Sequence, residues 1–383
     1  MSYAYIAKGA LFLVDEQGGI LELESEFSQK QLREFEKRKQ YSPVQRDEEA
    51  SPFALSPWMG HSSTARFEGY RFADMVRIDE RYLLYTLCTR TVTGLFRYDL
   101  VHKSERRLVH SNDFKFDGLD YNGETEQICV GQRHGDGSAN IELRDLDGRL
   151  LQQLTGGDSV DTAPAYSRKD SNRILFQSQG IARDDEGLFV AVGPASVNFL
   201  NVAEGNLEEL VAEEGYDFLV PKEGPDGAFY CIRRPEFSAV KVPLHRTLVA
   251  ALLFPFNFVH ALFNFLTVFT ELFKNQPTLA SGPPAPPLPK NQRMMVLGQA
   301  VELGKQKARR NGEDEEVLVP ENWELIRVAE GAAPEPIARH VCAFDINPEG
   351  HVYYTNGYSV FRWDGARHEK LSRHELVERV QAG

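Results

Sequence analysis

The stretch that decides the fold runs from residue 158 to residue 178, and it reads Asp158-Ser-Val-Asp161-Thr-Ala-Pro164-Ala-Tyr166-Ser167-Arg-Lys-Asp170-Ser-Asn-Arg-Ile174-Leu-Phe176-Gln-Ser178. It begins with a short run of apolar and β-branched residues, continues through a polar turn, and ends in a second apolar run. Apolar runs on either side of a turn rich in Asp, Ser and Asn predict an antiparallel hairpin.

The same unit occurs four more times, at residues 77–90, 119–133, 220–233 and 344–356. The copies are spaced by roughly 40–50 residues once one long insertion is left out, which is the spacing of propeller blades. Two further strand candidates follow each copy, and residues 3–7, 10–14 and 20–24 supply about three strands of a sixth blade. The prediction is an all-β fold: a six-bladed β-propeller of four-stranded antiparallel blades with a helical insertion, closed by pairing between the two chain ends.

Residues 158–178, with the turns Pro225-Asp226-Gly227 and Asn347-Pro348-Glu349-Gly350, resemble the repeat of TolB-like six-bladed β-propellers. The resemblance covers residues 70–235 and 321–372 and, to a smaller degree, the N-terminal blade. It implies the fold but no activity, because this fold carries scaffolds, enzymes and sensors. The whole layout also resembles bacterial propeller proteins encoded beside MoxR-type ATPases and von Willebrand A-type domain proteins. That resemblance implies a partner of one of these two kinds.

Two segments interrupt the repeat. Within the first part of the propeller, residues 1–235, an excursion at 27–65 is predicted to form a charged helix over 28–39 and then a Ser/Pro-rich loop. The insertion, residues 236–320, contains an apolar run, a Pro-rich linker at 281–290 and a helix-like stretch at 294–310. Residues 321–383 are expected to close the propeller and to end in a C-terminal helix.

The apolar run of the insertion extends from Thr247 to Thr270 without one Asp, Glu, Lys or Arg, and six of its residues are Phe. It is long enough to cross a bilayer, but both of its flanks belong to neighbouring strands of one blade, which excludes a single crossing. Polar residues recur at steps of three and four from Asn257 to Lys274, as on one stripe of an amphipathic helix. The candidate contacts with a membrane surface or with a partner's groove are Leu252, Phe254, Phe256, Phe258, Phe263, Phe265, Phe269 and Phe273.

Cations begin the loops between the second and third strands of several predicted blades, and these loops share one face of a propeller. This basic face is predicted to bind an acidic partner surface, anionic lipid or a small anion. The alternative is that each cation pairs with a neighbouring carboxylate, such as Asp136, Asp184 or Asp185. The residues of the basic face are Lys8, Arg90, Arg133, Arg183, Arg233 and Arg234.

Composition and motifs exclude several classes of function. A net charge of −13 over 383 residues disfavours nucleic acid as a ligand. No GxSxG, GxGxxG, GxxxxGK[ST] or HExxH motif occurs, and the four cysteines form no CxxC pair, so no cofactor, no metal and no catalytic residue is predicted. The N-terminus has no basic region and no cleavage site of the signal-peptide type, so we expect a cytoplasmic protein, peripheral at the inner face of the membrane where the insertion meets lipid.

These observations favour a non-enzymatic scaffold for protein-protein interaction, attached to a membrane surface or a partner by the Phe-rich insertion. Two alternatives stay open. The first is a sensor that binds a small ligand in the central channel, and the second is a propeller-type hydrolase or lyase with a carboxylate or His at that channel.

Overall fold

The computed structural model describes residues 2–41, 70–89, 92–236, 293–303, 306–310 and 313–383. The chain divides into two units, Met1–Glu236 with Asn291–Gly383, and Phe237–Lys290, and the described residues all belong to the first. Within these residues the helix α1 (Glu26–Tyr41) is the only helix, and the other elements are strands in mainly antiparallel sheets. This confirms the predicted all-β class.

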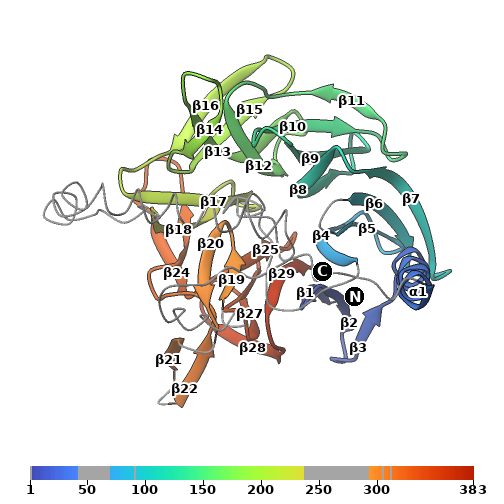
Figure 1. Ribbon diagram of the computed structural model, residues 1–383. Coiled ribbons are helices and arrows are strands. Elements are labelled where there is room, and N and C mark those ends of the chain that lie inside the picture. Colours follow the sequence, from blue (N-terminus) through green and yellow to red (C-terminus); the bar gives the residue numbers. More distant parts are fainter. Residues whose placement is uncertain (1, 42–69, 90–91, 237–292, 304–305, 311–312) are drawn as a thin grey trace, which may run out of the picture. The chain divides into compact units, whose positions relative to one another are not determined.

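Twenty-four of the described strands form six groups of four, each ordered from an inner first strand to an outer fourth strand (Figure 1). The first three groups in the chain are β4 (Arg71–Arg77), β5 (Tyr82–Cys88), β6 (Thr93–Asp99) and β7 (Ser104–Ser111); β8 (Phe114–Asn122), β9 (Gln127–His134), β10 (Ala139–Arg144) and β11 (Leu150–Gln153); and β12 (Ser159–Tyr166), β13 (Arg173–Arg183), β15 (Ser196–Asn201) and β16 (Asn206–Val211). One parallel bridge between β10 and β12 joins the second group to the third, and a short extra strand, β14 (Phe189–Val192), pairs with the end of β13.

The other three groups complete the set. They are β17 (Tyr216–Glu223), β18 (Phe229–Pro235), β23 (Glu324–Val328) and β24 (Glu335–Arg339); β25 (Ala343–Ile346), β26 (Val352–Thr355), β27 (Ser359–Trp363) and β28 (His368–Arg373); and β29 (Val377–Ala382), β1 (Tyr3–Ala7), β2 (Ala10–Val14) and β3 (Ile20–Leu23). The last group joins the two chain ends, as the sequence predicted, because β1 hydrogen-bonds to β29 on one side and to β2 on the other.

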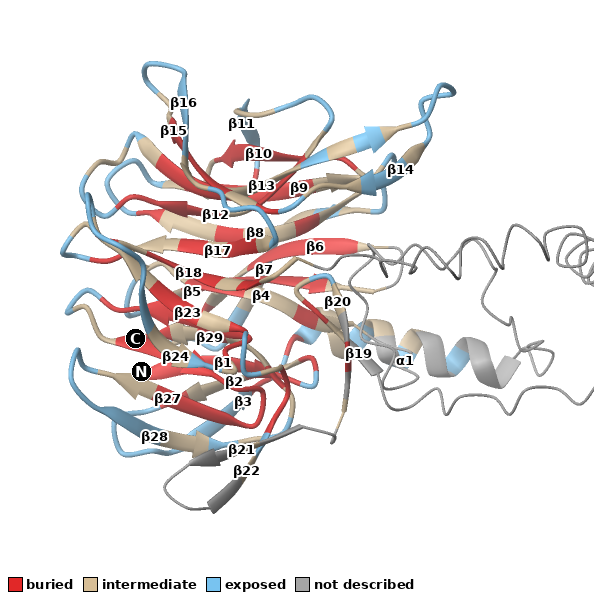
Figure 2. Ribbon diagram, turned by 90° about the vertical axis from the view of Figure 1, so that its left-hand side faces the viewer, coloured by how far each residue is buried: buried red, intermediate tan, exposed pale blue. Residues whose placement is uncertain are grey.

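The first strands of the six groups contact one another in the cyclic order β4, β8, β12, β17, β25, β29 and back to β4. Sheets arranged radially around a common axis in this way define a β-propeller, and we interpret the six groups as its blades. Second strands such as β5 and β9 are buried on both faces, whereas the fourth strands β3, β11 and β16 are mainly exposed (Figure 2). Side chains that lie on or near the axis therefore come from the first strands and from the loops that flank them.

Apolar side chains fill the space between adjacent blades. Between the blade β29-β1-β2-β3 and the blade β4-β5-β6-β7, for example, Ile6 of β1 and Leu11 of β2 join Leu83, Tyr85 and Phe96 in one cluster of fully buried residues. Helix α1 confirms the charged helix predicted over 28–39, and Phe27 in its first turn packs against this cluster. Its first residues are fixed because the Ser25 hydroxyl accepts the Ser28 N–H at 3.1 Å, which is an N-cap.

Two predicted helices are wrong. The C-terminal segment is strand β29, since Val377, Val380 and Ala382 are buried against the otherwise open edge of β1, and this pairing outweighs local helix propensity. The helix-like stretch at 294–310 instead forms β19 (Arg293–Val296), β20 (Gln299–Glu302) and β21 (Gln306–Arg310), the last paired with β22 (Glu313–Val317). Leu297 and Gly298 both have positive φ, 45° and 80°, so they form the two-residue turn that a tight hairpin prefers.

Candidate functional site

The first strands carry irregularities at similar heights in four successive blades. The pairing register shifts between Phe72 and Asp74 in β4, and it shifts again in β8, β12 and β17 within residues 116–119, 162–165 and 219–222. Bulges of this kind bend a strand and redirect its side chains, and they are frequent beside functional sites. In β4, β8 and β17 they stand beside charged residues that interact near the axis with charged residues of β25 and β29. We call this group the axial cluster; it consists of Asp74, Asp117, Asp120, Lys222, Asp345 and Arg379.

Lys222 is the central cation of the axial cluster. Its Nζ lies 2.6 Å from Oδ1 of Asp345, a residue of β25. The other carboxylate oxygen of Asp345 accepts the backbone N–H of Ala382 at 2.8 Å and the side-chain amide of Gln381 at 2.7 Å, both from β29. Burial by itself would lower the pKa of Lys222, but the nearby carboxylates, led by Asp345 and Asp120, raise it. The ammonium therefore stays charged and links β17 to β25, which in turn is bonded to β29.

Asp120 and Asp74 are the less closely paired carboxyls of the cluster. Burial raises the pKa of Asp120 even though Lys222 acts in the opposite direction, and Oδ2 of Asp120 accepts the Tyr166 N–H at 2.8 Å, which joins β8 to β12. Burial likewise raises the pKa of Asp74, and Arg379 is 3.9 Å from its Oδ1. Because neither carboxyl has a cation in close contact, these two are the groups of the cluster most easily protonated.

Asp117 shows the opposite behaviour. Burial would raise its pKa, but the Arg133 guanidinium, 2.7 Å away, outweighs this and keeps the pKa of Asp117 below its ordinary value. Asp117 lies deep in the protein and yet 38% of its side chain is exposed, and the side chain of Lys222 is 22% exposed. Solvent therefore reaches part of the axial cluster.

The chemistry available to the axial cluster is that of paired charges. Among the described residues, no group of three or more His, Cys, Asp or Glu is placed to hold a metal ion. The cysteines Cys129, Cys231 and Cys342 are buried thiols, and burial raises the pKa of each, to about 12 for Cys342, so their thiolates are not available as nucleophiles.

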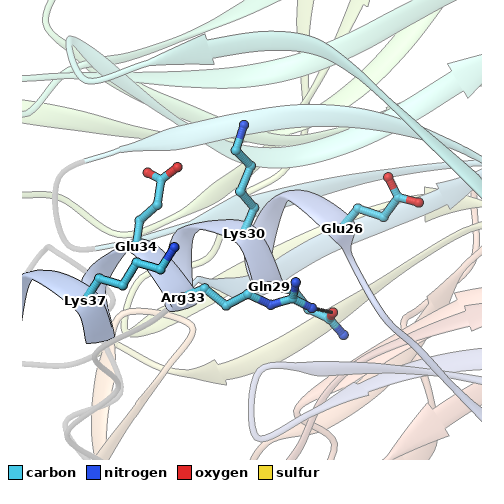
Figure 3. Close-up of a pocket in the computed structure, with 6 residues that line it drawn as sticks. All are labelled: Glu26, Gln29, Lys30, Arg33, Glu34 and Lys37. Carbon is cyan, nitrogen blue, oxygen red and sulfur yellow. Dashed lines mark hydrogen bonds between the residues drawn. The ribbon is translucent and has the colours of Figure 1, made fainter.

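A hollow of about 350 Å³ lies along α1, and its lining differs from that of a typical small-molecule pocket (Figure 3). Its lining side chains are Glu26, Gln29, Lys30, Arg33, Glu34 and Lys37. Binding pockets for small molecules are mostly apolar with a few polar groups, whereas this lining mixes charges of both signs. We assign it no ligand.

The described members of the basic face all contact carboxylates, as the alternative interpretation of the sequence anticipated. Their ion pairs are Lys8 with Glu375 at 2.5 Å, Arg133 with Asp117 at 2.7 Å, Arg183 with Asp158 at 2.6 Å and Asp136 at 3.4 Å, Arg233 with Glu324 at 2.6 Å, and Arg234 with Asp217 at 3.0 Å. Arg90 lies outside the described residues. Recruitment of an acidic ligand by this face stays a prediction.

The candidate contacts of the insertion also lie outside the described residues: Leu252, Phe254, Phe256, Phe258, Phe263, Phe265, Phe269 and Phe273. In the part of the chain that the structure describes, no helix has the length and apolar character needed to cross a bilayer.

The axial cluster was not predicted from the sequence. One signal pointed to part of it: two of the five repeat copies begin with an apolar residue followed by Asp, Leu119-Asp120 and Phe344-Asp345. A comparison of the copies by position would have placed these two carboxylates at corresponding points of two blades. The copy at residues 220–233 has a charged residue, Lys222, close to the corresponding position. The role of Lys222 depends on Asp345, which is far away in the sequence.

Comparisons with known proteins support the fold but identify neither a family nor a function. No family model matches the chain, and no curated protein matches it. Among solved structures, the tricorn protease is similar over 100% of this chain at 8% identity and a TM-score of 0.46; the chain spans about a third of that protein's length, 34%. A chain of a nidogen/laminin complex is similar over 99% of this chain and 96% of its own, at 7% identity and a TM-score of 0.50.

A putative TolB from Agrobacterium tumefaciens is similar over 81% of this chain and 83% of its own, at 13% identity and a TM-score of 0.42. Structural neighbours thus include TolB-like proteins, in line with the resemblance of the repeat. Identities this low bear on the fold alone, because one fold hosts many functions. The protein is a β-propeller whose axis carries a cluster of paired charges.

Proposed function

We propose that this β-propeller is a non-enzymatic interaction scaffold, and that its Phe-rich segment, residues 246–274, attaches it to a partner protein or to a membrane surface. The observation that carries the proposal is the pairing of β18 with β23. These strands are hydrogen-bonded neighbours from Phe229 opposite Val328 to Arg233 opposite Glu324, although residues 236–323 separate them in the chain. The blade is complete without the Phe-rich segment, so the segment is available for a role other than folding.

The composition of the segment supports an attachment role. Exposure to water of a run of 24 residues without a charged side chain is unfavourable in free energy. The propeller closes without this run, so the fold itself gives no reason to keep it exposed. Burial of a large apolar side chain contributes about 1.5–3 kcal/mol. The eight candidate contact residues together are more than sufficient for reversible attachment after the cost of association is subtracted.

The axial cluster supports a scaffold more than an enzyme. Its closest contacts pair opposite charges: Lys222 with Asp345 links the neighbouring first strands β17 and β25, and Asp117 with Arg133 links β8 to β9 within one blade. A hydrolase or lyase needs a base and an acid or nucleophile that are free to act on a substrate. Charges that neutralise each other are better suited to hold blades together.

The test compares three forms of the full chain: the wild type, a variant with Phe256, Phe263, Phe265 and Phe269 replaced by Ser, and a control in which the Pro-rich residues 281–289 are replaced by Gly and Ser. Each is isolated from its native host with whatever co-purifies, and each is floated with vesicles of phosphatidylethanolamine and phosphatidylglycerol. Thermal unfolding shows whether the propeller is intact.

We expect the wild type and the control to retain one of the two associations, and the Phe variant to lose it while it stays folded. Loss on vesicles identifies a membrane surface; loss of a co-purifying protein identifies a partner, for which a MoxR-type ATPase or a von Willebrand A-type domain protein is the expectation from the resemblance. Equal behaviour of all three forms in both assays contradicts the proposal.

A further inference from the structure

One hairpin departs from the regular pattern of the blades. Strand β13 continues to Arg183, beyond the part that pairs with β12 and β15, and its last residues pair with β14 alone. We call residues 180–193 the projecting hairpin, and Figure 2 shows it extending past the neighbouring loops with mainly exposed residues at its tip. In four of the other five blades the same connection is short, for example the two-residue turn of Lys8 and Gly9 between β1 and β2, and in the blade β17-β18-β23-β24 it is the long insertion, residues 236–323.

One face of the projecting hairpin is fixed to the adjacent blade. Nε of Arg183 lies 2.6 Å from Oδ1 of Asp158, and Nη2 of the same side chain is 3.4 Å from Oδ2 of Asp136. The Phe189 ring lies against Gly137, where a Cβ would be 3.0 Å from Cδ2 of the ring, and Gly137 has a φ of 92° that only glycine adopts freely. These contacts hold the hairpin in place, so its other face is preorganised for binding.

The other face is apolar and exposed. Leu188 and Val190 are 60% and 59% exposed, among the most exposed large apolar side chains of the described residues, and Ala182 and Ala191 beside them are exposed as well. Within the described residues β14 has β13 as its sole pairing partner, so its second edge is open. An open edge beside exposed apolar side chains is a template for one more strand.

The charge of the hairpin specifies the occupant. Asp184, Asp185 and Glu186 form its exposed tip, and Arg183 beside the tip is already paired with two carboxylates. A second copy of the chain is a poor partner because its net charge is also −13. An extended segment in which apolar residues alternate with Lys or Arg fits both the apolar face and the acidic tip.

From these observations we infer that the projecting hairpin is a docking surface for a basic, extended segment of a partner protein, which adds a strand to the open edge of β14. The inference builds on the proposed scaffold function and gives the propeller itself a partner-binding surface, separate from the Phe-rich segment. Backbone pairing along β14 supplies affinity, and the acidic tip selects for cationic sequences.

The experiment uses a displayed library of random twelve-residue peptides, selected on the full chain and counter-selected on a Leu188→Glu/Val190→Glu variant. Both substituted side chains are exposed, so the fold should tolerate them, and a Leu207→Glu variant, with Leu207 62% exposed on β16, is the matched control. An Asp185→Lys/Glu186→Lys variant tests the charge without touching the apolar face. The best peptide is then synthesised for binding and hydrogen-exchange measurements.

We expect enriched peptides in which apolar residues alternate with Lys or Arg. The apolar variant and the charge variant should each weaken binding at least tenfold, the control should stay within twofold, and the amides of residues 189–192 should become protected from exchange. The inference is overturned if no peptide depends on the apolar face, if the enriched peptides are acidic or have helical periodicity, or if exchange protection lies elsewhere. Replacing the four Phe residues of the insertion should leave peptide binding unchanged, so failure of either proposal is seen separately.

Discussion

Two blades of this propeller are assembled from strands far apart in the sequence, and they differ in what that distance means. In the blade β29-β1-β2-β3 the chain ends meet, and β29 contacts both β25 and β4, so the ring depends on it. In the blade β17-β18-β23-β24 the long connection leaves between the second and third strands and returns without altering their pairing. Pairing of the two chain ends closes the propeller in the first of these blades. The long connection in the second blade adds a segment to a propeller that is already closed.

Removal of β29 should have the largest effect. A chain ending at Leu376 loses the strand that covers β1, the buried side chains of Val377 and Val380, and two hydrogen bonds to Asp345. The lost burial and the exposed edge together exceed about 5 kcal/mol, a large part of the stability of a typical domain. Circular dichroism during heating should show no cooperative transition; a transition like that of the full chain would mean that the ring does not need β29.

Replacing Lys222 by Met should come next. It leaves the Asp345 carboxylate buried to 2% exposure without its cation, and loss of one partner of a buried pair costs about 3–5 kcal/mol. Asp120→Asn is the matched control, since it removes a less closely paired charge and should change stability by about 1 kcal/mol or less. Urea unfolding measures both, and equal effects of the two substitutions would show that Lys222 is not the central cation of the cluster.

The pH dependence of stability separates the two kinds of carboxyl. For Asp74 and Asp120 the folded pKa is raised, so above the ordinary pKa of 3.8 the native state binds more protons than the unfolded state, and their contribution falls as pH increases through the raised value. For Asp117 the folded pKa is lowered, so its contribution is present above the ordinary value and is lost as pH falls through the folded one. Urea unfolding between pH 3 and pH 7 should show a flatter decline with rising pH in Asp74→Asn than in the wild type; parallel curves would contradict this assignment.

The smallest effect is expected at the basic face. Lys8 and Glu375 are both largely exposed, and exposed pairs contribute about 0–1 kcal/mol. Lys8→Ala should therefore shift the unfolding free energy by less than about 1 kcal/mol, measured by urea titration, and the shift should shrink further in high salt. A larger shift would mean that this turn has a role in ring closure that its contacts do not explain.

The fold could be predicted from the sequence because its information is local and repeated. Each copy of the hairpin, such as Leu119 to Arg133, carries its own apolar runs and polar turn, and a blade short of one strand predicts a partner from the other chain end. The prediction of a C-terminal helix was wrong because this segment forms β29, and its partner β1 lies at the opposite end of the sequence. Local secondary-structure propensity cannot predict a pairing between strands so far apart in the sequence.

The site could be predicted only in part, because its contacts are between distant residues. Arg233 was predicted at the start of a blade loop, but it lies within β18, and its partner, Glu324, is 91 positions away. Lys222 meets Asp345 across two blades, and no spacing in the sequence links them. The acidic tip of the projecting hairpin was visible in the sequence, but its exposure beside an open strand edge depends on the length of β13.

The central claim is that the propeller is complete without the segment that we propose attaches it, and one replacement tests this claim most directly. Residues 237–290 are replaced by a flexible linker of about ten residues, and thermal unfolding and partner or vesicle association are measured on the same preparation. Shortening a loop about fivefold should stabilise the fold by about 1 kcal/mol, so we predict an unchanged or slightly higher unfolding midpoint together with lost association. A propeller that no longer folds, or one that still associates as the wild type does, would contradict the account.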